Sequence, residues 1–431
     1  MSFARYPAYK DSGVEWLGEV PGHWEVKRLK YNLQLLTEKT NRGEHAIALE
    51  NIESWTGRYL PTETEFEGDG VAFEAGDILF GKLRPYLAKA YLTESSGEAV
   101  GDFHVLRPTP NTNARFAQYQ ILNREFIDLV DGSTFGSKMP RASWEFVAGI
   151  ALAAPPLVEQ QAIATFLDTE TAKIDGLMAE QRALVALLKE KRQAVISHAV
   201  TKGLHPAAPM KDSGVAWLGE VPEHWEVKKV KHLTSRISSG KTPLGGSEVY
   251  VDDGVTFLRS QNVYDDGLRL DDVVYIADAV DEAMAVSRVK PNDILLNVTG
   301  ASIGRTCLVP LDLPPANVNQ HVCVIRVAEE KQILFMSWLF KSATIKNQID
   351  HAQNGAAREG LNFSQIGEMA FALPPPQEQL AIVEFLNHQT AQLDTLTQEA
   401  QTAIALLQER RTALISAAVT GKMDVRAAVA A

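Results

Sequence analysis

The sequence is poor in cysteine and has no long apolar run, and both shortages limit what the protein can be. Only Cys307 and Cys323 occur, so a disulfide scaffold is excluded and a pair of buried free thiols is expected. No stretch of about 18 consecutive apolar residues is present, which argues against a membrane-spanning helix. The N-terminus also lacks the basic-then-apolar pattern of a signal peptide. These absences predict a cytoplasmic protein.

The sequence also lacks the motifs that enzymes commonly need. Gly240–Thr242 reads Gly-Lys-Thr, but Ser235 stands where a phosphate-binding loop requires its upstream glycine. There is no HExxH, paired CxxC or strand-anchored GxGxxG, and the Asn/Asp-Pro-Pro-aromatic signature of amino-methylating DNA methyltransferases is missing. His23 and His224 lie within a repeated stretch and are interpreted as structural. We therefore predict neither a catalytic residue nor a metal site in this chain.

The sequence also has fewer basic residues, 42, than acidic ones, 54. The formal net charge is -12, which taken alone argues against nucleic-acid binding. Residues 31–154 carry 11 basic and 17 acidic groups, and residues 232–373 carry 12 and 17. Any surface for nucleic acid must therefore be a local basic patch on an acidic domain.

The dominant feature that is present is an internal repeat. Residues 10–30 read KDSGVEWLGEVPGHWEVKRLK and residues 211–231 read KDSGVAWLGEVPEHWEVKKVK, so 17 of 21 positions agree at an offset of 201. A second matched pair, PPLVEQQAIATFLDTETAKID from Pro155 and PPPQEQLAIVEFLNHQTAQLD from Pro374, has an offset of 219. The chain is thus one module written twice, and we expect a circular arrangement with a pseudo-two-fold axis and neighbouring termini.

The segments between these markers differ far more, but they still align in patches. The pattern indicates one fold whose surface has been rewritten, with Arg107 and Arg326 interpreted as structural residues at strand ends. The other matched pairs are Asn51 with Asn262, Asp77 with Asp293, and Lys89 with Arg305.

Each proline pair begins a long helical segment. Proline is tolerated in the first turn of a helix, and Glu159 and Glu378 then place an acid near its positive end. Apolar residues recur with a period close to 3.5, which predicts an antiparallel coiled coil, with two separate amphipathic helices as the alternative. The expected seam pairs are Ile163/Ile382, Leu167/Leu386, Ile174/Leu393, Leu177/Leu396, Leu188/Leu407 and Val195/Leu414.

The central domains are predicted to be mixed α/β (α+β). Strand-like runs end at Phe80, Leu106, Leu296 and Val327, and helices are expected over Phe116–Leu129 and Ile333–Ile349. The predicted boundaries are 1–154 for a first mixed domain, 155–204 for a central helical spacer, 205–373 for a second mixed domain, 374–423 for a C-terminal helical spacer and 424–431 for a tail.

The repeated opening, the Gly-Asp-Ile-Leu/Asn-Asp-Ile-Leu strands and the Pro-Pro-x-x-Glu-Gln helix starts together resemble specificity subunits of type I restriction-modification systems. The resemblance covers essentially the whole chain, twice. It implies two target recognition domains that each read half of a bipartite double-stranded DNA site, in a system that defends against phage. It also implies two methyltransferase (modification) subunits and restriction/translocase subunits as partners, and assigns S-adenosylmethionine, ATP and Mg to those partners.

Arg and Lys suit guanine, and Asn and Gln suit adenine, whereas any basic side chain can meet a phosphate. We expect DNA contacts from the basic or amide-bearing loops, with a solvated surface charge as the alternative for each residue. The candidates are Lys82, Arg84, Lys89, Lys138 and Arg141 in the first domain, and Lys241, Gln261, Asn262, Arg305 and Arg358 in the second. The outer helix faces are expected either to dock partners or simply to meet water, through Glu159, Gln160, Lys191, Arg192, Glu378, Gln379, Arg410 and Arg411.

Two rival functions stay open. A methyltransferase or nuclease activity in this chain would require a catalytic constellation that the motif search does not find. A scaffold whose duplicated domains bind protein rather than DNA would fit the acidic charge. Binding to random duplexes with a steep salt dependence would separate the scaffold from a DNA reader.

Overall fold

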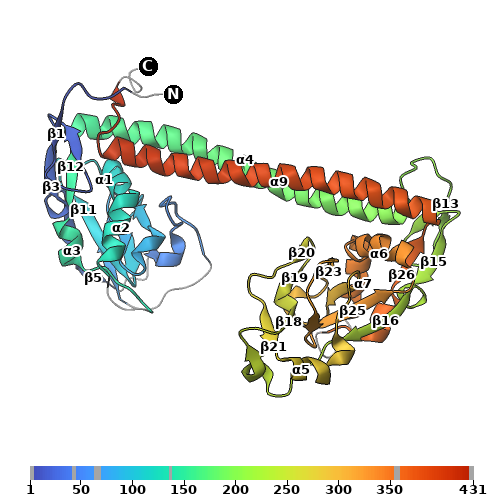
Figure 1. Ribbon diagram of the computed structural model, residues 1–431. Coiled ribbons are helices and arrows are strands. Elements are labelled where there is room, and N and C mark those ends of the chain that lie inside the picture. Colours follow the sequence, from blue (N-terminus) through green and yellow to red (C-terminus); the bar gives the residue numbers. More distant parts are fainter. Residues whose placement is uncertain (1–3, 41–44, 63–68, 135–137, 354–359, 427–431) are drawn as a thin grey trace. The chain divides into compact units, whose positions relative to one another are not determined.

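The computed structural model describes residues 4–40, 45–62, 69–134, 138–353 and 360–426. The chain forms two compact units: unit 1 comprises Met1–Arg182 and Gln401–Ala431, and unit 2 comprises Ala183–Ala400. Both long helices are therefore divided between the units (Figure 1). These are α4, Leu157–Lys202, and α9, Pro376–Val419. In the described part of the chain, no helix is both long and apolar enough to cross a membrane.

Unit 1 is a mixed α/β structure. Two four-stranded sheets, with orders β4-β11-β8-β9 and β5-β7-β10-β6, carry its central domain, and β3 pairs with β12. Its strands are β1 Tyr9–Asp11, β2 Glu19–Pro21, β3 Glu25–Arg28, β4 Leu33–Leu36, β5 Lys39–Thr40, β6 Ala46–Ile47, β7 Gly70–Phe73, β8 Ile78–Gly81, β9 Ala90–Leu92, β10 Gly97–Val100, β11 Phe103–Pro108 and β12 Ala151–Ala154. Its shorter helices are α1 Ala114–Ile121, α2 Arg124–Gly132 and α3 Trp144–Gly149.

Unit 2 repeats part of this topology. The sheet β16-β25-β22-β23 corresponds to β4-β11-β8-β9, and β15 pairs with β26 as β3 pairs with β12. Its strands are β13 Met210–Asp212, β14 Glu220–Pro222, β15 Glu226–Lys229, β16 Thr234–Ser239, β17 Tyr250–Val251, β18 Val255–Leu258, β19 Val263–Tyr264, β20 Gly267–Leu268, β21 Val274–Ile276, β22 Ile294–Asn297, β23 Thr306–Leu308, β24 Ala316–Val318, β25 Val322–Val327 and β26 Ala370–Leu373. Its shorter helices are α5 Asp278–Ala283, α6 Ile333–Phe340, α7 Ala343–Gln353 and α8 Phe363–Glu368.

The mixed α/β prediction is confirmed, with one difference repeated in both units. Each central helix that we expected to be continuous is two helices separated by a short turn, α1 and α2 in unit 1 and α6 and α7 in unit 2. Asn123 and Ser342 stand at these turns, and such side chains favour helix starts over helix interiors. Cys307 and Cys323 are free and buried, as expected.

The long helices run antiparallel where they meet inside each unit. In unit 1 the start of α4, with Ile163 and Leu167, packs in one cluster with the end of α9, at Ile415 and Val419. In unit 2 the end of α4 at Ile196 packs in one cluster with the start of α9, which includes Ile382, Val383 and Leu386. This is the predicted coiled-coil direction.

One predicted seam pair is wrong. Leu177 and Leu396 face solvent, with exposed fractions of 47% and 48%. The buried residue after Ile174 is Met178, at 5% exposure. A step of four residues departs from the starting direction by about 40°, and a step of three by about 60°, so Met178 lies closer than Leu177 to the face of Ile174. Further along, Ile196 and Ile415 are buried more completely than the predicted Val195 and Leu414, which stay partly exposed.

A repeated tryptophan fastens each helix pair, and we call this arrangement the Trp–Glu clamp. Trp24 and Trp225 are fully buried, and each indole Nε1 donates to the first-turn glutamate of a helix, Glu159 or Glu378, at 2.9 Å. The neighbouring His23 and His224 meet the same carboxylates at 2.6 Å.

The same two rings also touch the glycines that end the helices. Gly203, after α4, has a φ of 75°, and a Cβ there would lie 3.1 Å from the Trp225 ring. Gly421, after α9, has a φ of 76°, and a Cβ there would lie 2.9 Å from Trp24. Each tryptophan thus joins the start of one long helix to the end of the other.

Candidate nucleic-acid interface

Three of the predicted basic residues of unit 1 come together on one short pair of segments. Leu83 and Arg141 form an antiparallel bridge. The amide of Arg84 donates to Pro140 O, and the amide of Ala142 donates to Lys82 O, both at 2.9 Å. We call the paired segments, residues 82–84 and 140–142, the basic ladder. They are 58 residues apart in sequence at their central bridge, so only folding brings Lys82, Arg84 and Arg141 together.

Asp102 is an acidic residue that contacts both segments of the basic ladder. Its carbonyl accepts the Lys82 amide at 2.9 Å. Its carboxylate accepts from both Nε and Nη2 of Arg141 at 2.9 Å, whereas Lys82 Nζ lies 4.0 Å away. These hydrogen bonds raise the pKa of the Arg141 guanidinium. Arg141 is therefore held by a two-point contact, and Lys82 only loosely.

Arg84 and Lys138 are the exposed cations beside this pair. Neither side chain forms an ion pair with any residue that the structure describes. Arg84 also adopts left-handed backbone geometry, with a φ of 50°, which is uncommon for a residue other than glycine and often marks functional loops. These two side chains are available to an anion.

Lys89 and Arg305, the matched basic pair, have different surroundings. Lys89 Nζ donates to Leu49 O at 2.6 Å, and burial lowers the pKa of this amine. Arg305 lies over the Tyr264 ring, 4.7 Å from its centroid, and Arg269 contacts the same ring at 5.1 Å. Lys89 therefore has an internal partner, whereas Arg305 is stacked on a half-buried aromatic ring.

Unit 2 repeats the backbone of the basic ladder without its charges. Leu361 donates to Val298 O at 2.9 Å, and Val298 donates to His321 O at 3.0 Å, which are the bonds made by Ala142 and Lys82 in unit 1. The positions of Lys82 and Asp102 are thus held by Val298 and His321. Arg358, the candidate next to this segment, lies outside the described residues.

The remaining candidates of unit 2 lie on separate loops. Lys241 is exposed. Gln261 is also exposed, and its amide donates to Asp272 at 2.6 Å. Asn262 is 1% exposed, and its side chain accepts the Arg259 amide at 2.9 Å and donates to Arg269 O at 2.9 Å.

Asn51 in unit 1 closes its turn in the same way as Asn262, by accepting the Ala48 amide at 2.9 Å. Asn51 and Asn262 match in the sequence although their neighbours differ, and this match indicates a structural contact that both units share. The structural interpretation of Arg107 and Arg326 is confirmed, because each makes a two-point ion pair, with Asp77 at 2.8 Å and with Asp293 at 2.6–2.7 Å.

Most of the proposed docking residues on the long helices already have partners within their own unit. Glu159 and Glu378 belong to the Trp–Glu clamps. Gln160 and Gln379 are buried and donate to the carbonyls of Pro155 and Pro374. Arg411 is buried beside Asp175, and Arg192 pairs with Asp394. Lys191 and Arg410 are exposed.

Exposed leucines are a second surface feature of the helices, which the sequence analysis missed. Leu187 and Leu406, at 62% and 60% exposure, occupy equivalent positions of the two repeats, as do Leu177 and Leu396. Each unit therefore presents one leucine of each kind to solvent. For Leu187 and Leu406 the signal was available in the sequence, since a residue that is apolar in both copies but off the expected seam has no role inside the coiled coil.

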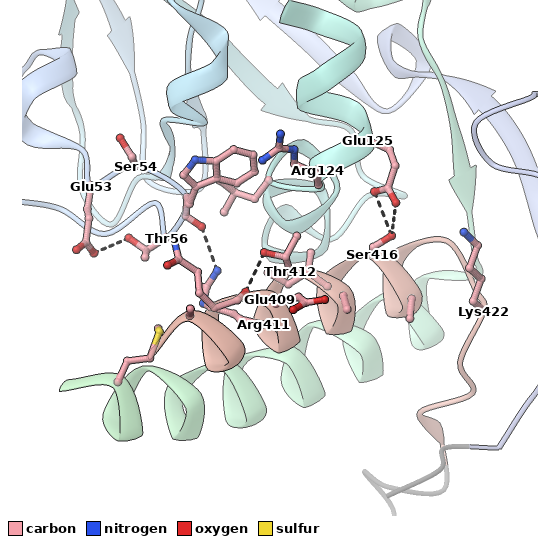
Figure 2. Close-up of a pocket in the computed structure, with 18 of the residues that line it drawn as sticks. Glu53, Ser54, Thr56, Arg124, Glu125, Glu409, Arg411, Thr412, Ser416 and Lys422 are labelled. Carbon is pink, nitrogen blue, oxygen red and sulfur yellow. Dashed lines mark hydrogen bonds between the residues drawn. The ribbon is translucent and has the colours of Figure 1, made fainter. Parts of the chain in front are cut away.

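Unit 1 also contains a cavity of about 730 Å³ between its central domain and the long helices. Figure 2 shows the loop of Glu53–Thr56 facing α9 across this cavity. Arg411 crosses from α9 to donate to Trp55 O at 3.1 Å, and Ser416 donates to the Glu125 carboxylate at 3.0 Å (Figure 2). Asp175 accepts from both Arg411, at 3.0 Å, and Arg58, at 2.6 Å. These contacts fasten the first central domain to its helices.

The chain is similar to known proteins over most of its length. A family model described as the type I restriction modification DNA specificity domain matches residues 222–405. The EcoBI specificity subunit of Escherichia coli is 26% identical over 312 residues, which cover 70% of this chain and 64% of that relative, just under two thirds of its length. The MjaVIII specificity subunit of Methanocaldococcus jannaschii is 22% identical, with 94% of each chain covered.

Solved structures share the fold. A chain from a study of complex assembly and conformational transition in a type I R-M system has a TM-score of 0.73 and 16% identity, covering 93% of this chain and 98% of that one. The HsdS subunit of Thermoanaerobacter tengcongensis has a TM-score of 0.51 and 16% identity, covering 94% and 98%. The duplicated frame, the matched domain and this shared fold agree with one another: the chain is similar to type I restriction-modification specificity subunits over most of its length.

Proposed function

We propose that this chain is the DNA-reading subunit of a type I restriction-modification enzyme and that it catalyses no reaction itself. Each unit carries one recognition domain, and each domain reads one half of a bipartite duplex site. The duplication supports this assignment, because two copies of one fold with rewritten surfaces are suited to reading two different sequences.

The observation that carries the proposal is the basic ladder. Residues 31–154 are acidic overall, yet Lys82, Arg84 and Arg141 lie together on two paired segments, and Lys82 and Arg141 share a single carboxylate, Asp102. Phosphate contacts need exposed cations, and base contacts need donors held in a fixed geometry. Arg84 and Lys138 meet the first requirement and Arg141 meets the second.

The same proposal assigns the partners. Two methyltransferase subunits and the restriction/translocase subunits would assemble on the chain, and the equivalent exposed leucines of the two units would give two equivalent docking surfaces. S-adenosylmethionine, ATP and Mg would bind to those partners. Since host DNA is the target, the complex would act in the cytoplasm.

A protein-binding scaffold is the second candidate, and the net charge of -12 is the observation that favours it. The two functions predict opposite responses to salt. A DNA reader loses affinity for duplexes steeply as salt rises, because counterions are released on binding. A protein scaffold shows no duplex binding to lose.

The test uses the full-length chain assembled with the modification subunits of its own system. Binding to duplex DNA should weaken for the double variant Arg84→Ala, Lys138→Ala on every sequence alike. The slope of log affinity against log salt should fall by about 0.9 for each phosphate contact that is lost. The control is Arg28→Ala, which removes an exposed arginine of the same unit outside the basic ladder. Unchanged binding by the double variant would contradict the proposal.

A further inference from the structure

Arg141 differs from the other cations of the basic ladder in how firmly it is held. Its backbone is fixed by the bridge to Leu83, and the carbonyl of Asp102 is fixed by the Lys82 amide. The guanidinium then donates from Nε and Nη2 to the two carboxylate oxygens, both at 2.9 Å. Nevertheless, the Arg141 side chain is 50% exposed. The pair is ordered and still accessible.

This contact uses one edge of the guanidinium, and the other edge has no hydrogen-bond partner among the residues that the structure describes. A guanidinium has five N–H donors in a rigid plane, and two of them face Asp102. The Nη1 and Nη2 hydrogens on the opposite edge form a parallel pair of donors. In the major groove, guanine presents N7 and O6 as two adjacent acceptors, and a two-point contact with arginine is the commonest base-specific contact.

The negative charge of Asp102 also favours a base over a phosphate as the partner of Arg141. A phosphate beside Arg141 would lie near the Asp102 carboxylate and would be repelled by it, whereas a neutral base edge would not. Arg84 and Lys138 have no such counter-charge among the described residues. Holding the side chain in advance also lowers the entropic cost of using it in a complex.

Unit 2 provides an internal comparison. The repeat offset of 219 places Gly360 at the position of Arg141 and His321 at the position of Asp102, while two backbone hydrogen bonds of the ladder, made by Val298 and Leu361, are kept. These two backbone hydrogen bonds therefore form without an arginine–aspartate pair. The pair is present in unit 1, and the equivalent described positions of unit 2 are a glycine and a histidine.

We propose that Arg141, oriented by Asp102, reads one guanine in the half-site bound by unit 1, and that Asp102 is its positioning residue. This inference rests on the proposed function. It goes further by naming the base, the residue that reads it and the half-site that contains it.

The experiment selects bound duplexes from a library with both half-sites randomised, using the full-length chain with its modification subunits. The wild-type complex should require a guanine at one position of one half-site at least. Arg141→Ala and Arg141→Lys should reduce that preference by about 5- to 150-fold, which is the range for one two-point base contact. The other half-site should stay unchanged.

Two further variants separate orientation from charge. Asp102→Asn should weaken the preference at the same position. The amide oxygen can accept only one of the two hydrogen bonds from Arg141, and the amide NH₂ group is a donor that would face a second donor, Nε or Nη2. Arg84→Ala, the matched control, should weaken binding to all sequences equally and flatten the salt dependence, without changing the selected guanine.

Three results would overturn the inference. One is a wild-type half-site without any guanine preference. Another is an Arg141→Ala complex that selects the same sequence as wild type. The third is an Arg141→Ala complex whose melting temperature falls while its base preference is kept, which would make the pair purely structural. A wild-type complex that selects no sequence at all would instead refute the proposed function, so the two failures are distinguishable.

Discussion

Removing the carboxylate of Asp175 tests whether burial decides the strength of the contacts between the long helices. The internal repeat supplies two equivalent ion pairs, Arg411–Asp175 in unit 1 and Arg192–Asp394 in unit 2. In the first pair the side chains are 9% and 8% exposed, and in the second they are 22% and 55% exposed. Arg58 adds a further contact to Asp175 but has no counterpart on Asp394 among the described residues.

We expect Asp175→Asn to destabilise unit 1 by about 3–5 kcal/mol, because it leaves the buried Arg411 without its counter-charge. We expect Asp394→Asn to cost unit 2 about 0–1 kcal/mol, as is usual for an exposed pair. For a unit of this size each kcal/mol lowers the melting temperature by roughly 2–4 °C. Asp175→Asn should therefore lower it by roughly 6–20 °C, and Asp394→Asn by roughly 4 °C at most.

The assay should be local, because two units can unfold separately. Hydrogen exchange read by mass spectrometry on peptides from residues 157–182 and 401–419 should show faster exchange in Asp175→Asn. Peptides from residues 183–202 and 376–400 should be nearly unaffected in Asp394→Asn. Equal loss of protection in the two variants, or a cost below about 1 kcal/mol for Asp175→Asn, would refute the argument from burial.

Three further predictions follow from the same structure. Replacing residues 31–154 with another recognition domain should change only one half of the methylated site, as mapped by single-molecule sequencing of host DNA; a change in both halves would contradict the model of one reader per unit. Joining the termini and opening the chain between Leu204 and Met210 should leave an active protein, because the Asp424 amide already donates to Ala4 O at 2.8 Å; an insoluble or inactive product would argue against it. Burial raises the pKa values of the Cys307 and Cys323 thiols to about 12, so a thiol reagent at pH 8 should label neither residue in the folded chain and both in denaturant. The stability that these neutral thiols contribute is complete below about pH 9 and is lost as the pH rises toward 12, and rapid labelling of the folded chain would contradict their burial.

The sequence predicted those parts of the fold that depend on repetition and periodicity. The near-identical openings and the proline pairs located both frames and both long helices. The helix phase was predicted less well, because Leu177 matches a period of 3.5 in the sequence, whereas the step from Ile174 to Met178 keeps the buried face. A heptad pattern of apolar residues does not by itself show which of two neighbouring positions meets the partner helix.

The candidate interface was predictable in its residue types but not in its assembly. Lys82, Arg84 and Arg141 were chosen as basic residues in loops, yet nothing local in the sequence pairs residues 82–84 with 140–142 or brings Asp102 to Arg141. The prediction of a DNA contact by Asn262 rested on an amide that suits adenine. The same amide also suits the closing of a turn, and in the structure Asn262 closes a turn. Long-range contacts of this kind depend on strand pairing, which periodicity does not specify.

The strand pairs at the base of each central domain have a consequence for how new specificities can arise. Strand β3 pairs with β12 from Glu25↔Ala154 to Arg28↔Ala151, and β15 pairs with β26 in the same way. Each recognition domain therefore enters and leaves its frame at adjacent points, as a cassette bounded by two repeated tracts. Recombination between matching tracts of two genes would exchange the whole cassette in one event and leave the Trp–Glu clamps intact. Under the proposed function, a host could thus acquire a new target sequence without having to evolve a new assembly.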